Sequence, residues 1–387
     1  MEMSRIGRAY RAGSLVWTNF CVLLVVVNVV AAIYLATRED GLAFGFLFRS
    51  PPQFIVEALE ISFPELDAEQ RAALWRESGI PFRPDPITGF REKAVTGEYV
   101  TVDEAGFRRG KEQGPWPPSG DAYNVFLLGG STAFGYGVPD EQTISSYLQE
   151  VLPAVDGREP RVYNFARGGF TSTMERLLFE KLILVEPRPD LVIFLDGVND
   201  FGQPGDPVLV QRYLTRRTDE ALERPWLGAL RSLPLVRTLA GDDWTNIGLA
   251  DLPRDQSERL AADDSDRLDA VIARYVSNVQ AIRGIASAHG VDVFFVWQPA
   301  PVYKYDLSYH THKSQRFGGH ERSRHGFPRM RAYVDAHPMG DDFTWCADIQ
   351  EDAKELLYVD RMHYNPKMST MVARCIADGL VDGGLPQ

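Results

Sequence analysis

Short apolar runs and longer amphipathic segments alternate along most of the chain. Four apolar runs have the length of buried strands and are bounded by turn residues, at 125–130, 161–166, 190–197 and 291–301. Helical spacing follows at 142–152, 171–185 and 265–289, and the pattern closes with a short strand at 343–346 and a helix at 366–380. Strands that are apolar on both faces and separated by helices predict an α/β fold with a parallel sheet covered on both sides.

The longest apolar segment lies near the N-terminus. Leu15 to Ala36 is almost wholly apolar, and no charged residue stands between Arg11 and Arg38. At roughly 1.5 Å per residue, a helix of this length crosses a hydrocarbon core of ~30 Å. We therefore expect a transmembrane helix over residues 15–37, in contact with membrane lipid. A cleaved signal peptide is the alternative, although its apolar region usually has only ~7–15 residues.

The charges beside this segment predict its orientation. Three arginines precede it, whereas Glu39 and Asp40 follow Arg38. The positive-inside rule places residues 1–14 in the cytoplasm and exports everything after the helix. The prediction is a single-pass protein of the cytoplasmic (inner) membrane with a periplasmic or extracellular C-terminal domain. Polar residues within the span, Asn19 and Asn28, leave a membrane-protein partner open.

The exported part divides into two regions. Residues 38–118 contain short helical segments at 54–61 and 67–77, then prolines and a β-like alternation at 97–108. We expect a membrane-proximal stalk with a β extension there, and the main domain at 119–387. Within that domain, residues 202–262 are polar and lack helical spacing.

Composition and charge exclude several classes of protein. Of 387 residues, 44% are hydrophobic and 24% are charged, which is ordinary for a folded domain. The formal net charge of −12 argues against a nucleic-acid partner, because phosphate is held mainly by Lys and Arg. Three cysteines cannot form a disulfide scaffold. Cys346 and Cys375 lie in the exported part, where both a disulfide and two buried thiols are compatible with the sequence.

Polar motifs follow the predicted strands where the strands end. They are Gly-Gly-Ser-Thr at 129–132, Asn-Phe-Ala-Arg-Gly-Gly at 164–169, Gly-Val-Asn-Asp at 197–200 and, near the C-terminus, Asp-Arg-Met-His at 360–363. The carboxyl ends of parallel strands share one edge of a sheet, so these groups are expected to meet there. Each motif alone is also typical of an ordinary turn.

Together the motifs predict a nucleophile site. Ser131 needs a base to remove its proton, and of seven histidines only His363 has a carboxylate, Asp360, three residues before it. That spacing lets Asp360 hold one ring nitrogen and leaves the other for the serine. The N–H groups of Ser131 and Gly169 and the amide of Asn199 are the candidate oxyanion donors.

This order of motifs resembles the SGNH (GDSL-type) hydrolases over roughly residues 85–380. The segments PDPITGFR, EAGFRRG and LLGGSTAFGYGVPDEQTISSYL resemble a membrane-anchored bacterial subgroup with GGST in place of GDSL. The resemblance implies a flavodoxin-like three-layer α/β/α sandwich, a Ser131–His363–Asp360 triad, the three oxyanion donors, acyl-ester chemistry and no cofactor or metal. In this sequence Gly130 replaces the aspartate of GDS, and there is no G-x-S-x-G elbow.

Two function classes follow from these features. The first is an exported acyl-ester hydrolase or acyltransferase that acts on acylated envelope polysaccharide or, as a second choice, on membrane lipid. The second is a non-catalytic envelope protein with the same fold that binds glycan or joins a membrane complex. The histidine-rich, basic stretch 310–337 is expected to be a solvated loop, with a metal site or an anion-binding flank of the cleft as alternatives.

Overall fold

A computed structural model of the chain describes residues 5–36, 51–184, 188–202, 233–236, 262–313 and 317–384. Two compact units make up the chain, one formed by residues 1–48 with 214–246 and the other by residues 49–213 with 247–387. Most of the polar stretch 202–262, predicted to lack helical spacing, lies outside the described residues.

The described part of the first unit is dominated by one helix, α1 (Arg5–Ala36). Within it, Gly13–Ala31 is long and apolar enough to cross a membrane. Many of its large apolar side chains are exposed, including Val16 and Trp17. The amide of Asn28 donates to the Leu24 carbonyl, and its oxygen accepts the N–H of Leu235, so this polar group is satisfied within the unit. A membrane anchor and a signal sequence share these properties.

The second unit is built around a sheet of five parallel strands. They are β5 (Tyr123–Gly129), β6 (Pro160–Asn164), β7 (Leu191–Asp196), β8 (Asp292–Trp297) and β9 (Phe343–Trp345). Their spatial order is β6-β5-β7-β8-β9, the 2-1-3-4-5 order of flavodoxin-like folds. Every residue of β5 and β7 is buried, because helices cover both faces of these central strands. The predicted parallel sheet is confirmed.

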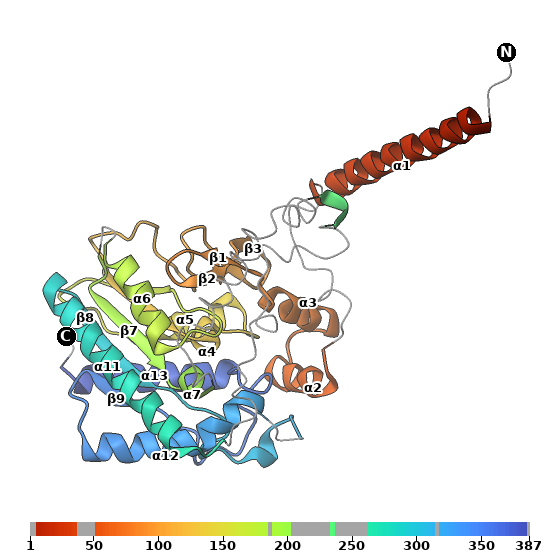
Figure 1. Cartoon of the computed structure of the whole chain (residues 1–387). Helices are drawn as coiled ribbons and strands as arrows, with labels where there is room; N and C mark the ends of the chain where they lie inside the picture. Colours follow the sequence, from red (N-terminus) through yellow and green to blue (C-terminus); the bar gives the residue numbers. More distant parts are fainter. Residues whose placement is uncertain are drawn as a thin grey trace. The chain divides into compact units, whose positions relative to one another are not determined.

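Helices form the two outer layers (Figure 1). Helix α5 (Ile144–Val151) packs against α13 (Pro366–Asp382) on one face, and α6 (Ser172–Leu182) packs against α11 (Ser265–His289) on the other. Helix α11 buries Leu268, Val271, Ile272 and Tyr275, one face of a 3.6-residue period. It begins at the capping side chain of Asp264 and ends at Gly290, whose φ is +67°.

Residues before the sheet pack onto it. In α2 (Gln53–Ser62) and α3 (Ala68–Ser78), apolar side chains form one cluster with Val138 and Val359. Strands β1 (Phe82–Asp85) and β2 (Gly89–Glu92) make an antiparallel hairpin, and β3 (Val95–Thr96) pairs with β4 (Thr101–Val102). A bridge between Arg108 and Asn164 joins this region to β6. The predicted domain boundary at residue 118 stays a prediction.

The solvated loop expected at 310–337 is wrong for two parts of that stretch. Residues 321–336 form helix α12, which buries Phe327 and Met330 and carries Pro328 in its interior. His310 and His312 are buried beside Phe317 and other aromatic rings. Among the described residues, no group of three or more His, Cys, Asp or Glu side chains is arranged to hold a metal ion.

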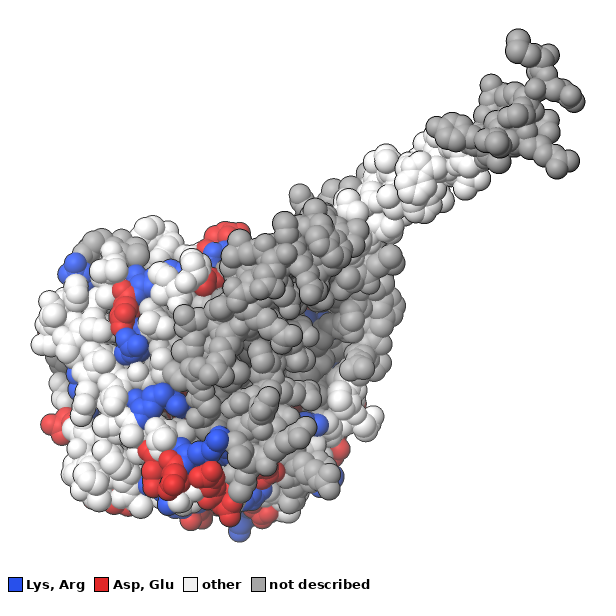
Figure 2. Space-filling model, in the orientation of Figure 1, with Lys and Arg blue, Asp and Glu red and all other residues white. Residues whose placement is uncertain are grey.

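Surface charge is mixed on the face of the described residues that Figure 2 shows. On the described part of the face shown in Figure 2, acidic and basic side chains lie next to one another rather than in one large patch of a single sign. Exposed pairs such as Lys111–Glu150 and Lys304–Glu351 have this character, and each contributes little to stability.

Cys346 and Cys375 form a disulfide that joins the segment after β9 to α13. It lies at the core, since Cys346 has no exposed surface. Of the two states that the sequence allowed, the structure has the crosslinked one.

Removing this crosslink is expected to destabilise the protein. The disulfide spans 29 positions of sequence, and closing a loop of that size in the unfolded chain is worth roughly 2–4 kcal/mol. We expect the Cys346→Ala, Cys375→Ala double variant to lose that free energy of unfolding, measured by urea titration in detergent, and Cys21→Ala to lose little. Thiol titration of the unfolded, unreduced wild-type protein should detect one free thiol per chain. Three free thiols, together with a urea midpoint of the double variant equal to that of wild type, would contradict the crosslink.

Candidate active site

Ser131 begins helix α4 (Ser131–Phe134), directly after β5 and the N-cap residue Gly130. The strand ends at the carboxyl edge of the sheet, so the serine lies at that edge and is half-buried. A β-carbon at Gly130 would come within 2.3 Å of the side-chain nitrogen of Asn199. Glycine at 130, the position of aspartate in GDS, therefore lets the Asn199 amide approach the serine turn closely.

The side chains of Ser131, His363 and Asp360 lie in one hydrogen-bonded line. The Oγ atom of Ser131 is 2.8 Å from Nε2 of His363, and Nδ1 of His363 is 2.6 Å from Oδ2 of Asp360. The other carboxylate oxygen of Asp360 accepts the N–H groups of Met362 and His363, both at 2.8 Å. The three-residue spacing thus forms a tight turn in which Asp360 fixes both the backbone and the ring of His363.

The charge state of Asp360 fits this arrangement. Burial alone would raise the pKa of Asp360, but the charge of His363 and the hydrogen bonds from His363 and Met362 lower it to about 2. The carboxylate is therefore ionised at neutral pH and accepts the Nδ1–H of His363. With the proton on Nδ1, the lone pair of Nε2 faces the hydroxyl of Ser131.

The candidate oxyanion donors lie on neighbouring turns. Asn199 is in helix α7 (Val198–Gly202), directly after β7, and its side-chain nitrogen donates to the Phe170 carbonyl at 2.8 Å. A side-chain amide has two hydrogens, so this bond uses one of them. Gly169 precedes Phe170 and has a φ of +77°, in the left-handed region that favours glycine. The bond from Asn199 thus ties the turn after β7 to the turn after β6.

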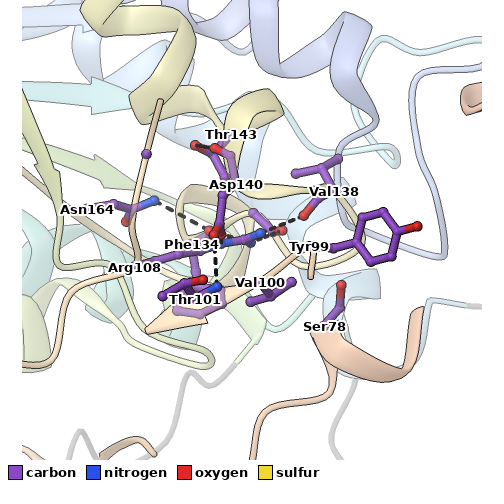
Figure 3. A network of polar contacts seen from close by, with 12 residues as sticks. Ser78, Tyr99, Val100, Thr101, Arg108, Phe134, Val138, Asp140, Thr143 and Asn164 are labelled. Carbon is purple, nitrogen blue, oxygen red and sulfur yellow. Dashed lines mark hydrogen bonds and ion pairs between the residues drawn. The ribbon is translucent and has the colours of Figure 1, made fainter. Parts of the chain in front are cut away.

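A buried arginine, which the sequence did not single out, supports the turn after Ser131 (Figure 3). The fully buried Arg108 side chain donates from Nε to Asp140 at 2.9 Å. Its guanidinium also donates to the carbonyl oxygens of Phe134, Gly135 and Val138. Five N–H donors in a planar fork suit such a set of acceptors. Arg108 thereby holds the backbone that leaves α4.

Two more side chains next to the site were not predicted from the sequence. The ring of Tyr136 stacks on that of His363, with centroids 5.4 Å apart and an angle of 29°. Glu92 of β2 is buried and accepts the N–H of Gly168 at 2.7 Å. Glutamate in an alternating β segment is usually solvent-facing, so the sequence alone carries no signal for this contact.

Three carboxyl groups lie buried beneath the turn of Asn199, on Glu175, Asp196 and Asp200. Asp200 accepts both the N–H and the hydroxyl of Ser172. Burial and the neighbouring charges of Asp196 and Asp200 raise the pKa of Glu175 well above its ordinary value of 4.5. Burial likewise raises the pKa of Asp196. Ionising this cluster therefore costs folding free energy.

This cluster predicts a pH-dependent gain from one substitution. The pKa of Glu175 is higher in the folded chain than in the unfolded chain. The free energy of unfolding is therefore unaffected by Glu175 below pH 4.5 and decreases as the pH rises toward the folded pKa. Glutamine cannot ionise, so Glu175→Gln should have a higher free energy of unfolding than wild type at pH 8. The gain should shrink toward zero near pH 4. A lower urea midpoint than wild type at pH 8 would contradict this.

Comparisons with known proteins address the family. The family model described as GDSL-like Lipase/Acylhydrolase matches residues 127–370, more than half of the chain. That segment contains the four motifs of the site and the sheet except for the first residues of β5. No curated protein matches this chain.

Several solved structures are similar to this chain at low identity. The lipase/acylhydrolase from Enterococcus faecalis is 14% identical, with a TM-score of 0.37, covering 68% of this chain and 98% of that one. Est24, a carbohydrate acetylesterase from Sinorhizobium meliloti, is 15% identical, with a TM-score of 0.34 and coverages of 67% and 98%. A G-D-S-L lipolytic family member from Veillonella parvula DSM 2008 is 10% identical, with a TM-score of 0.33 and coverages of 67% and 96%.

The sheet and the family match agree. The five parallel strands run in flavodoxin-like order, helices cover both faces, and the matched segment runs from β5 into α13. On this evidence the chain belongs to the GDSL-like lipase/acylhydrolase family, the SGNH hydrolases.

Proposed function

We propose that this protein is a membrane-anchored, exported serine acyl-ester hydrolase or acyltransferase. Ser131 is the nucleophile, His363 the general base and Asp360 the residue that orients and stabilises the imidazolium. The observation that carries the proposal is the hydrogen-bonded line from Ser131 Oγ through both ring nitrogens of His363 to Asp360, at 2.8 Å and 2.6 Å. A serine hydroxyl is a weak nucleophile until a base takes its proton, and this line of side chains provides that base.

The reaction proceeds in two halves. Nε2 of His363 takes the hydroxyl proton as Oγ of Ser131 attacks the ester carbonyl, and the carbonyl oxygen becomes an oxyanion. The N–H groups of Ser131 and Gly169 and the free amide hydrogen of Asn199 stabilise that oxygen. The C–O bond to the alcohol then breaks, and His363 returns the proton to the departing alcohol. Water or a sugar hydroxyl, deprotonated by His363, then attacks the acyl carbon. The bond from that carbon to Oγ of Ser131 breaks, and His363 returns the proton to Oγ. This chemistry requires no metal or organic cofactor.

The proposed substrate follows from the proposed location. Anchoring by residues 15–37, with the N-terminus in the cytoplasm, places the hydrolase domain beside envelope polysaccharide and the outer leaflet. We favour acylated, above all O-acetylated, saccharide as the acyl donor or acceptor, and membrane lipid as the second class. The GGST turn and the N-terminal helix support assignment to the membrane-anchored subgroup.

Ester turnover by the full chain in detergent micelles tests the proposal. We expect p-nitrophenyl acetate to be hydrolysed faster than p-nitrophenyl palmitate, and a fluorophosphonate probe to label Ser131 stoichiometrically by intact mass and peptide mapping. A preference for palmitate would favour a phospholipase. No turnover and no labelling, together with stable co-purification of partner chains, would favour the non-catalytic envelope protein.

A further inference from the structure

Glu92 is a buried acid in a segment that precedes the family match. It ends β2, pairs in register with Phe82 of β1, and is 3% exposed. Phe90 and Glu92 are the two inward-facing residues of this strand. Burying a carboxyl group is unfavourable unless hydrogen bonds replace its water. The partners of Glu92 therefore indicate why it is there.

Two groups that donate hydrogen bonds to Glu92 lie next to the candidate active-site residues. Its Oε1 atom accepts the N–H of Gly168 at 2.7 Å, one residue before the candidate oxyanion donor Gly169. The same oxygen accepts the hydroxyl of Tyr136 at 3.4 Å. These contacts are closely fitted, because a β-carbon at Gly168 would lie 2.9 Å from both the Tyr136 hydroxyl and Cζ of Phe82.

Tyr136 links this carboxyl group to the imidazole. Its ring stacks on the ring of His363, and its hydroxyl points to Glu92 on the other side. Glu92 is thus linked to Gly169 through the neighbouring residue Gly168, and to His363 through the side chain of Tyr136. The chain positions that carry these contacts come from three separate segments: the β1–β2 hairpin, the turn after α4 and the turn after β6.

We propose that Glu92 is a positioning residue, whose carboxylate fixes both the Gly168–Gly169 turn and, through Tyr136, the ring of His363. This inference rests on the proposed function. A carboxylate is suited to this role because hydrogen bonds to an ionised acceptor are roughly twice as strong as neutral ones. Protonation would leave one of its oxygens as a donor and weaken the hold on the turn.

The pKa of Glu92 lies near neutral pH. Burial raises the pKa of Glu92 to about 7, against the lowering effects of the Gly168 N–H, the positive charge of Arg167 and the hydroxyl of Tyr136. Arg167 is itself buried and lies 3.9 Å from Asp85 of the same hairpin. The carboxylate form, and with it the ordered turn, is therefore gained as pH rises through 7.

Glu92→Gln tests the proposal, with Glu77→Gln as the matched control. The Glu77 carboxylate also accepts backbone N–H groups, but those of Tyr99 and Val100 instead of the N–H of Gly168. The rate of fluorophosphonate labelling of Ser131 in the full chain would be measured from pH 5.5 to 8.5. We expect the ratio of wild type to Glu92→Gln to fall from about tenfold at pH 8.5 to near one at pH 5.5. The ratio for Glu77→Gln should not change with pH.

Hydrogen exchange of the Gly168 amide provides a readout that needs no turnover. We expect exchange to be about tenfold faster in Glu92→Gln than in wild type at pH 8.5. If Ser131 is labelled but the ratio is flat with pH, or Gly168 exchanges at the wild-type rate, the role of Glu92 is rejected while the proposed function stands. If wild-type Ser131 is never labelled, the proposed function is rejected, and an unchanged Gly168 rate would then reject the contact as well.

A second variant guards against misfolding of Glu92→Gln. Tyr136→Phe removes the hydroxyl and keeps the ring on His363. We expect labelling two- to fivefold slower than wild type at pH 8.5, with no difference at pH 5.5. Equal rates at every pH would show that Glu92 does not act through Tyr136.

Discussion

Ser131→Ala is expected to lower kcat for p-nitrophenyl acetate at least about 10³-fold. The hydroxyl is the atom that forms the acyl-enzyme, so no other group in the line can replace it. A residual rate above that of water should survive, because oxyanion donors and substrate binding act without the nucleophile. Steady-state kinetics of the full chain in micelles measures both values.

Folding of this variant should be unaffected. Ser131 is half-buried at the first position of α4, and alanine is a good helix former there. Ser265→Ala is the matched control, since Ser265 is also the first residue of a helix, α11, and is exposed. A Ser131→Ala protein that keeps more than a tenth of wild-type kcat would rule out the serine as nucleophile.

Asp360→Asn is expected to lower kcat about 10³–10⁴-fold with little change in KM. Asparagine can still accept the N–H groups of Met362 and His363 through its oxygen. Its nitrogen then faces Nδ1 of His363 and donates to it, which places the ring proton on Nε2, toward Ser131. The imidazole is left in the tautomer that cannot accept the hydroxyl proton.

The pH dependence of stability gives this variant a second signature. Because the pKa of Asp360 is lowered to about 2, its ionised form contributes stability above pH 3.8, which is lost as pH falls toward 2. Asp360→Asn should therefore unfold at lower urea than wild type at pH 7 and at a similar concentration near pH 2. Asp306→Asn, at an exposed turn cap, serves as the control for kcat. A kcat within tenfold of wild type would exclude the proposed role of Asp360.

Local pattern was enough to predict most of the sheet domain. The bounds of α11 match the predicted Ser265–His289, and the central strands were expected within two residues of their ends. These elements have strong periodicity or continuous apolar runs, so burial and secondary structure agree. The pairing of Asp360 with His363 was also accessible, because the two residues lie in one turn.

Contacts between distant segments could not be predicted in this way. The polar, basic composition at 321–336 indicated a loop, but packing of Phe327 and Met330 makes it a helix. Arg108 and Glu92 carry charges that composition assigns to the surface. Their burial depends on carbonyl and N–H groups supplied by residues 26 to 76 positions away. No pattern within one window of sequence contains that information.

The packing of α2 and α3 bears on how such a catalytic module can be transplanted between proteins. Val359, the residue before Asp360, and Val138, in the turn held by Arg108, share one apolar cluster with these two helices. The family-sized segment alone would leave that cluster open to water and the Arg108 acceptors unmatched. A chimera that transfers this domain to another protein must therefore carry residues 53–126 along with the family-sized segment.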